Sequence, residues 1–379
     1  MNMHVLHIVG ARPNFIKAAP VMRALGKRGK ARQTLVHTGQ HYDANMSDIF
    51  FRQLSIPAPD VNLGVGSGSH SGQTADIMTR LDPVIQERQP DLVLVYGDVN
   101  STLAGALVCA KANVPFGHVE AGLRSFDRSM PEEINRLLTD QVADLLFTPS
   151  ANADDNLRRE GVERAKIHLV GNVMIDTLTE LLPSAKKLWP LEAFRSTGDG
   201  DADSSAIAEA LAARYGLVTL HRPSNVDDAK SLRLLMTTLA RIHEVLPLVM
   251  PVHPRTKHRI EELGMGPSSG GPYLTEPLGY LEFLALQFHA TVVITDSGGV
   301  QEETTSLGIP CLTIRENTER PITVTVGTNT LVGSDMPKLE AEVDRIVAGG
   351  GKVGGTPAFW DGLAAERIAD VLRAWSGTR

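Results

Sequence analysis

Three carboxylates between residues 91 and 136 have the types and spacing of an acid/base site. Asp98 follows an unbroken apolar run over residues 92–95, which is typical of a strand buried on both faces of a parallel sheet, and Glu120 follows a second short strand over residues 116–119. Glu132 comes directly after Pro131, and proline is favoured at the first position of a helix. Because ligands of open α/β sheets bind at the carboxyl ends of the strands, we expect these carboxylates to share one crevice.

Each carboxylate also has a purely structural interpretation. An Asp after a strand is often a helix cap, and a Glu in a first helical turn is favoured by the helix dipole. For any one of the three residues alone, the structural interpretation is preferred. Three carboxylates at one edge instead favour acid/base chemistry, since neighbouring like charges push pKa values apart.

The helix expected after Pro131 is amphipathic. Its apolar residues recur at helical spacing and form one stripe, made of Ile134, Leu137, Leu138, Val142 and Leu145.

The elements around these residues alternate between strand and helix. Apolar strand patterns at residues 4–9, 35–38, 92–95, 116–119, 145–148 and 167–170 are separated by helical stretches. This alternation predicts a doubly wound α/β domain over residues 1–173, and the same pattern resumes over residues 174–355. A last amphipathic helix, in residues 356–379, must pack its apolar side on one of these two domains.

The second domain carries a phosphate-binding pattern. Ser297, Gly298 and Gly299 lie between an expected strand and a helix, and backbone N–H groups at such a helix start suit a phosphate. Glu303 is placed to accept hydrogen bonds from sugar hydroxyls, and Arg320 adds a cation downstream. The glycines alone are weak evidence, because a tight turn also requires them.

The first turn of the chain differs from a dinucleotide-binding turn. It reads GARPNF, without the G-x-G-x-x-G pattern, which lowers the expectation of nicotinamide chemistry. Arg12 and Lys17 instead place two cations near a helix start, where a phosphate or carboxylate is stabilised. A lone lysine is more often part of a solvated helix face, and that interpretation of Lys17 stays open.

Composition describes an ordinary globular chain. The 379 residues carry a formal net charge of −7, which argues against a nucleic-acid partner. Cys109 and Cys311 lie in apolar contexts, as reduced thiols do in a reducing compartment. No metal-binding spacing, membrane-span-like apolar run or signal-peptide pattern occurs. We therefore expect a cytoplasmic protein without a metal, a membrane partner or a nucleic-acid partner.

A set of motifs running in order along nearly the whole chain resembles the non-hydrolysing UDP-N-acetylglucosamine 2-epimerase family. The motifs are GARPNFIKAAP, GQHYD, GDVNSTLAG, GHVEAGLRS, MPEEINR, DSGGVQEE and TERPITVTVGTN. The resemblance implies an α/β, glycosyltransferase-B-like fold with two Rossmann-like domains, a closing helix that packs back on the first domain, and a homodimer. It also implies a UDP-sugar substrate and no cofactor.

The resemblance also assigns roles to residues of this chain. Asp98, Glu120 and Glu132 become the acid/base carboxylates, and His221 lies by the diphosphate. The remaining residues become binding residues: Ser297, Gly298, Gly299 and Arg320 for phosphates, Glu303 for the ribose, Phe283 for the uracil, and Arg12 and Lys17 from the first domain.

The expected reaction is reversible inversion at carbon-2 of UDP-N-acetylglucosamine, giving UDP-N-acetylmannosamine. The hydrogen on carbon-2 is not acidic, so inversion requires transient oxidation or transient loss of UDP. Without a dinucleotide turn, elimination to 2-acetamidoglucal and re-addition of UDP is favoured. Four alternatives remain: a hydrolysing epimerase, an epimerase of a modified UDP-sugar, a glycosyltransferase of the same fold, and a non-catalytic nucleotide-sugar binding protein.

Many bacterial members of this family have a second site, at which the substrate acts as an activator. This chain differs from them in the residues that correspond to that site. Those members carry His-Arg-Arg-Glu-Asn, whereas the corresponding residues here are His221-Arg222-Pro223-Ser224-Asn225. Pro223 replaces a cation and Ser224 a carboxylate, and Asp43 adds a negative charge in the other contributing segment. These changes predict catalysis without an activator.

Overall fold

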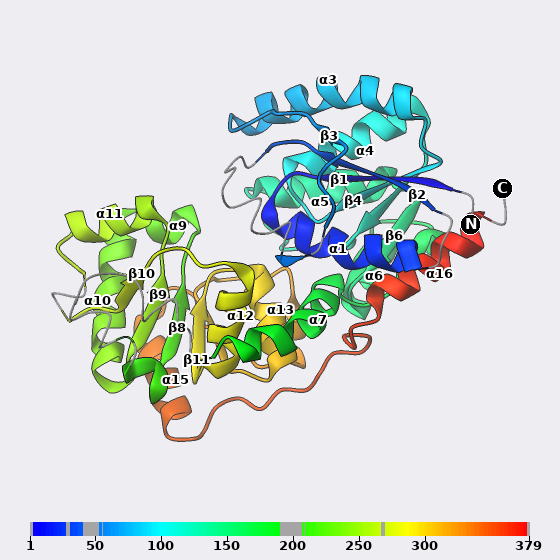
Figure 1. Cartoon of the computed structure of the whole chain (residues 1–379). Coiled ribbons are helices and arrows are strands. Elements are labelled where there is room, and N and C mark those ends of the chain that lie inside the picture. The colour runs from blue at the N-terminus through cyan, green and yellow to red at the C-terminus, as the bar shows by residue number, and fades with distance from the viewer. Residues whose placement is uncertain are drawn as a thin grey trace. The chain divides into compact units, whose positions relative to one another are not determined.

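The chain folds into two compact units. The computed structural model describes residues 3–27, 31–40, 53–54, 56–189, 207, 209–266 and 270–376. Unit 1 comprises Met1–Glu180 and Ala358–Arg379, and unit 2 comprises Leu181–Pro357. Each unit has its own parallel sheet with helices around it (Figure 1).

The sheet of unit 1 is parallel throughout its described strands, in the order β3-β2-β1-β4-β5-β6-β7. The strands are β1 (His4–Val9), β2 (Arg32–His37), β3 (Val61–Asn62), β4 (Leu92–Tyr96), β5 (Phe116–Val119), β6 (Leu145–Thr148) and β7 (Ile167–Leu169). All residues of β1, β4, β5 and β6 are buried, as expected for strands covered on both faces.

Helices cover this sheet and connect its strands. They are α1 (Arg12–Lys27), α3 (His70–Arg88), α4 (Asn100–Ala112), α5 (Pro131–Val142), α6 (Ala151–Arg159), α16 (Ala364–Ser376) and α7 (Val173–Lys187), of which the residues up to Glu180 belong to unit 1. The carboxylate of Asp176, in α7, accepts hydrogen bonds from the N–H groups of Ala364 and Ala365 at the start of α16 (3.1 and 2.6 Å). Helix α16 also packs against α1, so the end of the chain completes unit 1 (Figure 1).

Helix α5 buries its polar side rather than its apolar stripe. Its buried residues are Glu133, Asn135, Arg136, Thr139 and Asp140. The apolar residues Ile134, Leu138 and Val142 are 36%, 46% and 40% exposed. An amphipathic pattern alone assigns the apolar side to the core, and that assignment is wrong for α5.

Unit 2 repeats the architecture with the strand order β10-β9-β8-β11-β12-β13, again parallel. Its strands are β8 (Gly216–Thr219), β9 (Leu248–Pro251), β10 (Tyr273–Thr275), β11 (Val292–Thr295), β12 (Cys311–Thr313) and β13 (Asn329–Leu331). Its helices are α9 (Pro223–Val226), α10 (Ala229–Val245), α11 (Pro254–Glu262), α12 (Tyr280–His289), α13 (Gly298–Leu307), α14 (Pro321–Thr325) and α15 (Met336–Val347).

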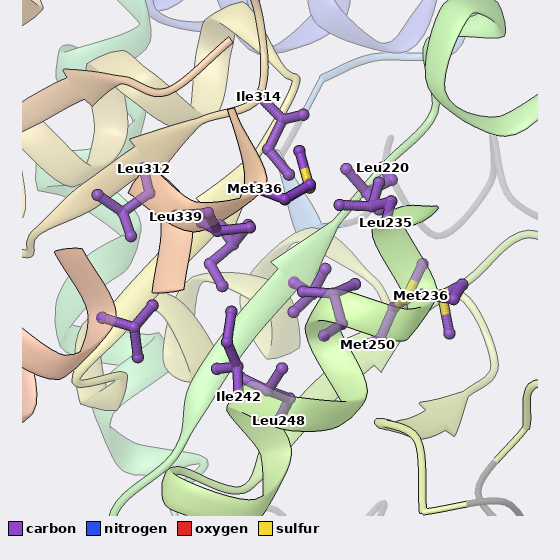
Figure 2. Close-up of a cluster of buried hydrophobic side chains, with 14 of the residues drawn as sticks. Leu220, Leu235, Met236, Ile242, Leu248, Met250, Leu312, Ile314, Met336 and Leu339 are labelled. Atoms are coloured by element: carbon purple, nitrogen blue, oxygen red, sulfur yellow. The ribbon is translucent and has the colours of Figure 1, made fainter. Parts of the chain in front are cut away.

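A continuous apolar core fixes the sheet of unit 2 against two of its helices. Leu235 and Ile242 of α10 and Leu339 of α15 meet Met250 and Leu312 from the strands (Figure 2). Burial of large apolar side chains on this scale is the main favourable term in folding. No helix in the described parts of the chain is long and apolar enough to cross a membrane.

Candidate functional site

Asn14 joins the ends of two central strands in unit 1. β1 and β4 are neighbours at the point where the strand order reverses, the usual ligand position in a doubly wound sheet. The Asn14 side-chain oxygen accepts hydrogen bonds from the N–H groups of Gly10 and Ala11, both at 3.0 Å. Its amide nitrogen donates to the Tyr96 carbonyl oxygen (2.7 Å), so one buried side chain holds both strand ends. Asn14 lies in the GARPNFIKAAP motif, but its type and position alone do not reveal this role.

Lys17 and Glu120 form a buried ion pair at the same edge of the sheet. Their side chains are 4% and 3% exposed. Lys17 therefore does not belong to a solvated helix face. Glu120 has a φ of 75°, a left-handed conformation that costs a non-glycine residue roughly 1–2 kcal/mol. Its backbone N–H donates to the Phe147 carbonyl oxygen (3.1 Å), which helps to hold that conformation.

Glycine is required at position 97, between β4 and Asp98. Gly97 has a φ of 64°, and a Cβ atom there would lie 2.8 Å from the Lys17 Nζ atom. The close approach of Lys17 therefore depends on the missing side chain.

Asp98 is held by two residues of α5. Arg136 Nε lies 3.0 Å from Asp98 Oδ2, and the Asn135 amide donates to the Asp98 carbonyl oxygen (2.9 Å). Arg136 also pairs with Glu133, whose carboxylate accepts hydrogen bonds from the N–H groups of Ser125 and Phe126, both at 2.9 Å. The buried polar side of α5 thus connects the loop after β5 to the residue after β4.

Two other predicted residues of unit 1 are more open to solvent. Glu132 is half-buried in the first turn of α5, whereas its neighbour Glu133 is buried. Arg12 is the first residue of α1 and is exposed. The structure thus brings Lys17 to Glu120 and Asp98 to Arg136. The part played by Arg136 was not recognised in the sequence, although it lies in one of the quoted motifs.

In unit 2, the Asp296 carboxylate holds residues 221–225, which follow β8, the neighbour of β11 in the sheet. Its carboxylate lies 2.8 Å from His221 Nδ1 and accepts hydrogen bonds from the N–H groups of His221 (3.1 Å) and Arg222 (3.0 Å) and from the Asn225 amide (2.9 Å). Burial raises the pKa of Asp296, but these hydrogen bonds and the His221 charge outweigh burial and lower it overall. The His221 side chain is 63% exposed, so one ring nitrogen is fixed while most of the ring faces solvent.

The start of α13 lies beside Arg320. A Cβ atom on Gly298 would collide with the Arg320 guanidinium, so glycine permits this approach. Ser297 is the N-cap residue, and Ser297, Gly298 and Gly299 are each half-buried.

Arg320 belongs to a buried cluster of ion pairs. Its guanidinium pairs with Glu302 (2.9 Å) and with Glu319, and Glu319 also pairs with Arg315 (2.6 Å). Two arginines thus face two glutamates, and the charges cancel inside the fold. The sequence indicated the cations but not this compensation.

Glu303 is buried between two helices. Its carboxylate accepts hydrogen bonds from the Tyr280 hydroxyl (2.9 Å) and the Gln287 amide (2.6 Å). Burial raises the pKa of Glu303, against the effect of these two hydrogen bonds. Phe283 is half-buried on α12, between Tyr280 and Gln287 in sequence. Among the residues that the structure describes, no group of three His, Cys, Asp or Glu side chains is arranged to hold a metal ion.

Comparison with known proteins agrees with this arrangement. A family model described as UDP-N-acetylglucosamine 2-epimerase matches residues 23–373. The chain is 43% identical over 370 residues to the UDP-N-acetylglucosamine 2-epimerase of Methanocaldococcus jannaschii, covering 96% of this chain and 97% of the relative. It is also 43% identical over 377 residues to the UDP-2,3-diacetamido-2,3-dideoxy-D-glucuronate 2-epimerase of Pseudomonas aeruginosa, covering 98% and 99%.

The solved structures agree as well. The crystal structure of the Methanocaldococcus jannaschii UDP-GlcNAc 2-epimerase in complex with UDP-GlcNAc and UDP superposes with a TM-score of 0.87 at 42% identity, covering 98% of this chain and 100% of that chain. The predicted α/β, glycosyltransferase-B-like fold class is confirmed. The chain belongs to the UDP-N-acetylglucosamine 2-epimerase family.

Proposed function

We propose that this epimerase reversibly converts UDP-N-acetylglucosamine to UDP-N-acetylmannosamine by elimination and re-addition of UDP. The observation that carries the proposal is the pair of carboxylates at the ends of neighbouring strands, Asp98 held by Arg136 and Glu120 held by Lys17. Both side chains are fixed in place before substrate arrives, as acid/base catalysis requires.

In the proposed reaction, a carboxylate removes the proton from carbon-2 while the bond between carbon-1 and the diphosphate oxygen breaks. The electron pair of that bond leaves with UDP, and the sugar becomes 2-acetamidoglucal. UDP then re-adds to carbon-1 as a proton reaches carbon-2 from the opposite face. Acid and base are assigned to Asp98, Glu120 and Glu132 as a group, and each proton transfer is worth roughly 10²–10⁴-fold.

Unit 2 is proposed to hold the leaving group. The N–H groups at the start of α13, after Ser297, suit the diphosphate, and His221 is oriented by Asp296 toward the same end of the sheet. Arg320, whose guanidinium lies beside Gly298, is assigned to the phosphates, Glu303 to the ribose, and Phe283 to the uracil. In unit 1, Arg12 and Lys17 are assigned to the substrate.

Epimerisation in heavy water tests the elimination route. We expect deuterium at carbon-2 of the product sugar, measured by proton NMR, because the proton removed by the enzyme exchanges with solvent. Retention of the original hydrogen would instead require an enclosed hydride transfer and would rule out elimination.

Two relatives at equal identity carry different substrate names, so the identity of the sugar needs its own test. We propose UDP-N-acetylglucosamine, with the diacetamido-glucuronate derivative as the second candidate. Measuring kcat/KM for both nucleotide sugars decides between them. The same NMR spectra would reveal free N-acetylmannosamine if the enzyme were of the hydrolysing type.

We also propose that the enzyme works as a homodimer through α5. Ile134, Leu138 and Val142 are spaced four residues apart, so their exposed side chains form one apolar face. A second copy of the same face would remove it from water. Light scattering should show a dimer for the wild type and a monomer for Leu138→Glu. Leu234→Glu, at another exposed leucine on α10, is the matched control and should remain a dimer.

A further inference from the structure

His118 lies at the centre of a buried hydrogen-bond chain in unit 1. It belongs to β5, two residues before Glu120, and its side chain is fully buried. Its Nε2 atom lies 2.7 Å from the Gly97 carbonyl oxygen, and its Nδ1 atom lies 2.6 Å from Asp140 Oδ1. A carbonyl oxygen only accepts hydrogen bonds, so Nε2 carries a proton.

Asp140 is also an acceptor at both of its oxygens. Its Oδ2 atom faces Arg124 Nη1 (2.7 Å) and the Gly122 N–H group (3.1 Å). Burial raises the pKa of Asp140, but His118 and Arg124 together outweigh burial and lower it. Asp140 is therefore ionised, and the His118 Nδ1 atom that faces it must carry a proton too.

The charges in this chain are balanced. Arg124 donates two hydrogen bonds to Glu160, at 2.7 and 2.6 Å, in addition to its contact with Asp140. An imidazolium on His118 and the guanidinium of Arg124 thus face the two carboxylates of Asp140 and Glu160. Buried charges are tolerated when each has a partner of opposite sign and satisfied hydrogen bonds, as here.

We propose that His118, whose two ring nitrogens both donate hydrogen bonds, is a positioning residue for the acid/base carboxylates. Its ring fixes the Gly97 carbonyl, while the Gly97 N–H group donates to the Val119 carbonyl oxygen (3.0 Å). The peptide group on each side of Gly97 is thereby tied to β5. We call these two hydrogen bonds of Gly97 the clamp. Since Asp98 follows Gly97 and Glu120 follows Val119, the clamp sets the distance between the two carboxylates.

The clamp deepens the proposed function and rests on it, because the carboxylates that it positions are the proposed acid and base. Displacement of a catalytic group by about 1 Å can cost roughly 10²-fold in rate. Loss of the clamp should therefore reduce turnover without weakening UDP binding, which is assigned to unit 2.

Nitrogen-15 NMR of the wild-type enzyme tests the protonation state without requiring activity. An ordinary histidine is neutral at about pH 8, having a pKa of about 6.5. We expect one histidine to keep both ring nitrogens protonated at that pH, and its signal to disappear in His118→Gln. If every histidine ring is neutral there, the proposal is wrong, whatever reaction the enzyme catalyses.

Asp140→Asn separates charge from geometry. The new amide can donate to a neutral Nδ1 atom while its oxygen accepts from Arg124 and Gly122, so the hydrogen bonds persist without the charge. We expect the doubly protonated signal to be replaced by that of a neutral ring protonated at Nε2. A signal that stays doubly protonated in Asp140→Asn would show that Asp140 does not support the imidazolium and would overturn the proposal.

Kinetics test the positioning role. We expect His118→Gln to lower kcat by about 10²-fold while UDP affinity stays within about twofold. His168→Gln, in the edge strand β7, is the matched control and should keep wild-type kcat. The positioning role would be refuted if His118→Gln had the same melting temperature as wild type and a kcat within about twofold of wild type. If that variant does not fold, the Asp140→Asn spectrum still decides the protonation state.

Discussion

Arg136 Nε lies 3.0 Å from Asp98 Oδ2, and the same guanidinium pairs with Glu133 on its own helix. This contact explains why α5 turns its polar side inward. The helix serves as a support for the residue at the end of β4 and for the loop after β5. Its apolar side is left for the partner subunit of the proposed dimer.

The first prediction concerns the two strand-end carboxylates. Asp98→Asn and Glu120→Gln should each reduce turnover by at least ~10²-fold, the lower end of what a general acid or base contributes. UDP affinity should stay within about tenfold, which corresponds to about 1.4 kcal/mol. Steady-state kinetics and calorimetric titration with UDP measure the two effects. Glu163→Gln, at an exposed glutamate, should change neither.

Glu120→Gln needs a separate stability control. It leaves the Lys17 ammonium buried without its anion, and breaking a buried ion pair typically costs ~3–5 kcal/mol. The double variant Lys17→Met/Glu120→Gln removes both charges and should recover most of that unfolding free energy. It should not recover turnover. Near-normal turnover in a folded Glu120→Gln protein would return Glu120 to a structural role.

The second prediction separates two roles of Arg320. Arg320→Ala should destabilise unit 2 by ~3–5 kcal/mol, because Glu302 and Glu319 would lose a buried cation. Arg320→Lys keeps the charge but loses the planar fork, so UDP binding should weaken by ~1.5–3 kcal/mol, the value of a charged hydrogen bond. Thermal unfolding and titration calorimetry report the two effects. Unchanged UDP affinity in Arg320→Lys would withdraw the phosphate assignment.

The third prediction is a pH dependence of stability centred on Asp176. Burial raises the pKa of Asp176 from 3.8 to about 6, against the hydrogen bonds from the Ala365 and Ala364 N–H groups. Because the pKa of Asp176 is higher in the folded than in the unfolded chain, its contribution to the free energy of unfolding is fully present below its pKa in the unfolded chain. It is lost as the pH rises through the folded pKa, by ~3 kcal/mol in all.

Asp176→Asn removes this ionisation, so it tests the sign directly. The unfolding free energy of wild type minus that of Asp176→Asn should be larger at about pH 4 than at about pH 7. Urea unfolding at several pH values across that window measures the difference. A difference that grows with pH would mean that Asp176 caps α16 as a stabilised carboxylate, with the two hydrogen bonds outweighing burial.

The fourth prediction is simple hyperbolic kinetics without an activator. An activator must bind one state of the enzyme better than another, and the proline at position 223 and the serine at 224 remove the expected source of that energy. Asp43 lies outside the described residues. The neighbouring Gln40 side chain is buried, and its oxygen accepts hydrogen bonds from the Ser101 N–H group (3.0 Å) and hydroxyl (2.7 Å).

Initial rates with UDP-N-acetylmannosamine alone test this prediction. The reverse reaction should start without a lag and follow a hyperbola. A sigmoidal curve that becomes hyperbolic with traces of UDP-N-acetylglucosamine would show that an activator site exists despite these substitutions.

The sequence by itself determined the elements and the edge of the sheet at which the chemistry is expected. Short, mainly apolar runs identified β1, β4, β5 and β6, because strands covered on both faces leave that local pattern. Asp98 and Glu120 were found because each lies within two residues of the end of such a strand. Whole-chain motif order added the family, which no local pattern determines.

Only the tertiary structure decided which groups pair with these residues. Lys17 meets Glu120, and His118 meets Gly97 and Asp140, because the strand order places β1, β4 and β5 side by side. For the same reason, the periodicity of α5 did not decide which of its sides is buried. Hydrophobic spacing records which side of a helix is apolar, but whether that side meets the core or another molecule depends on contacts between residues far apart in the chain.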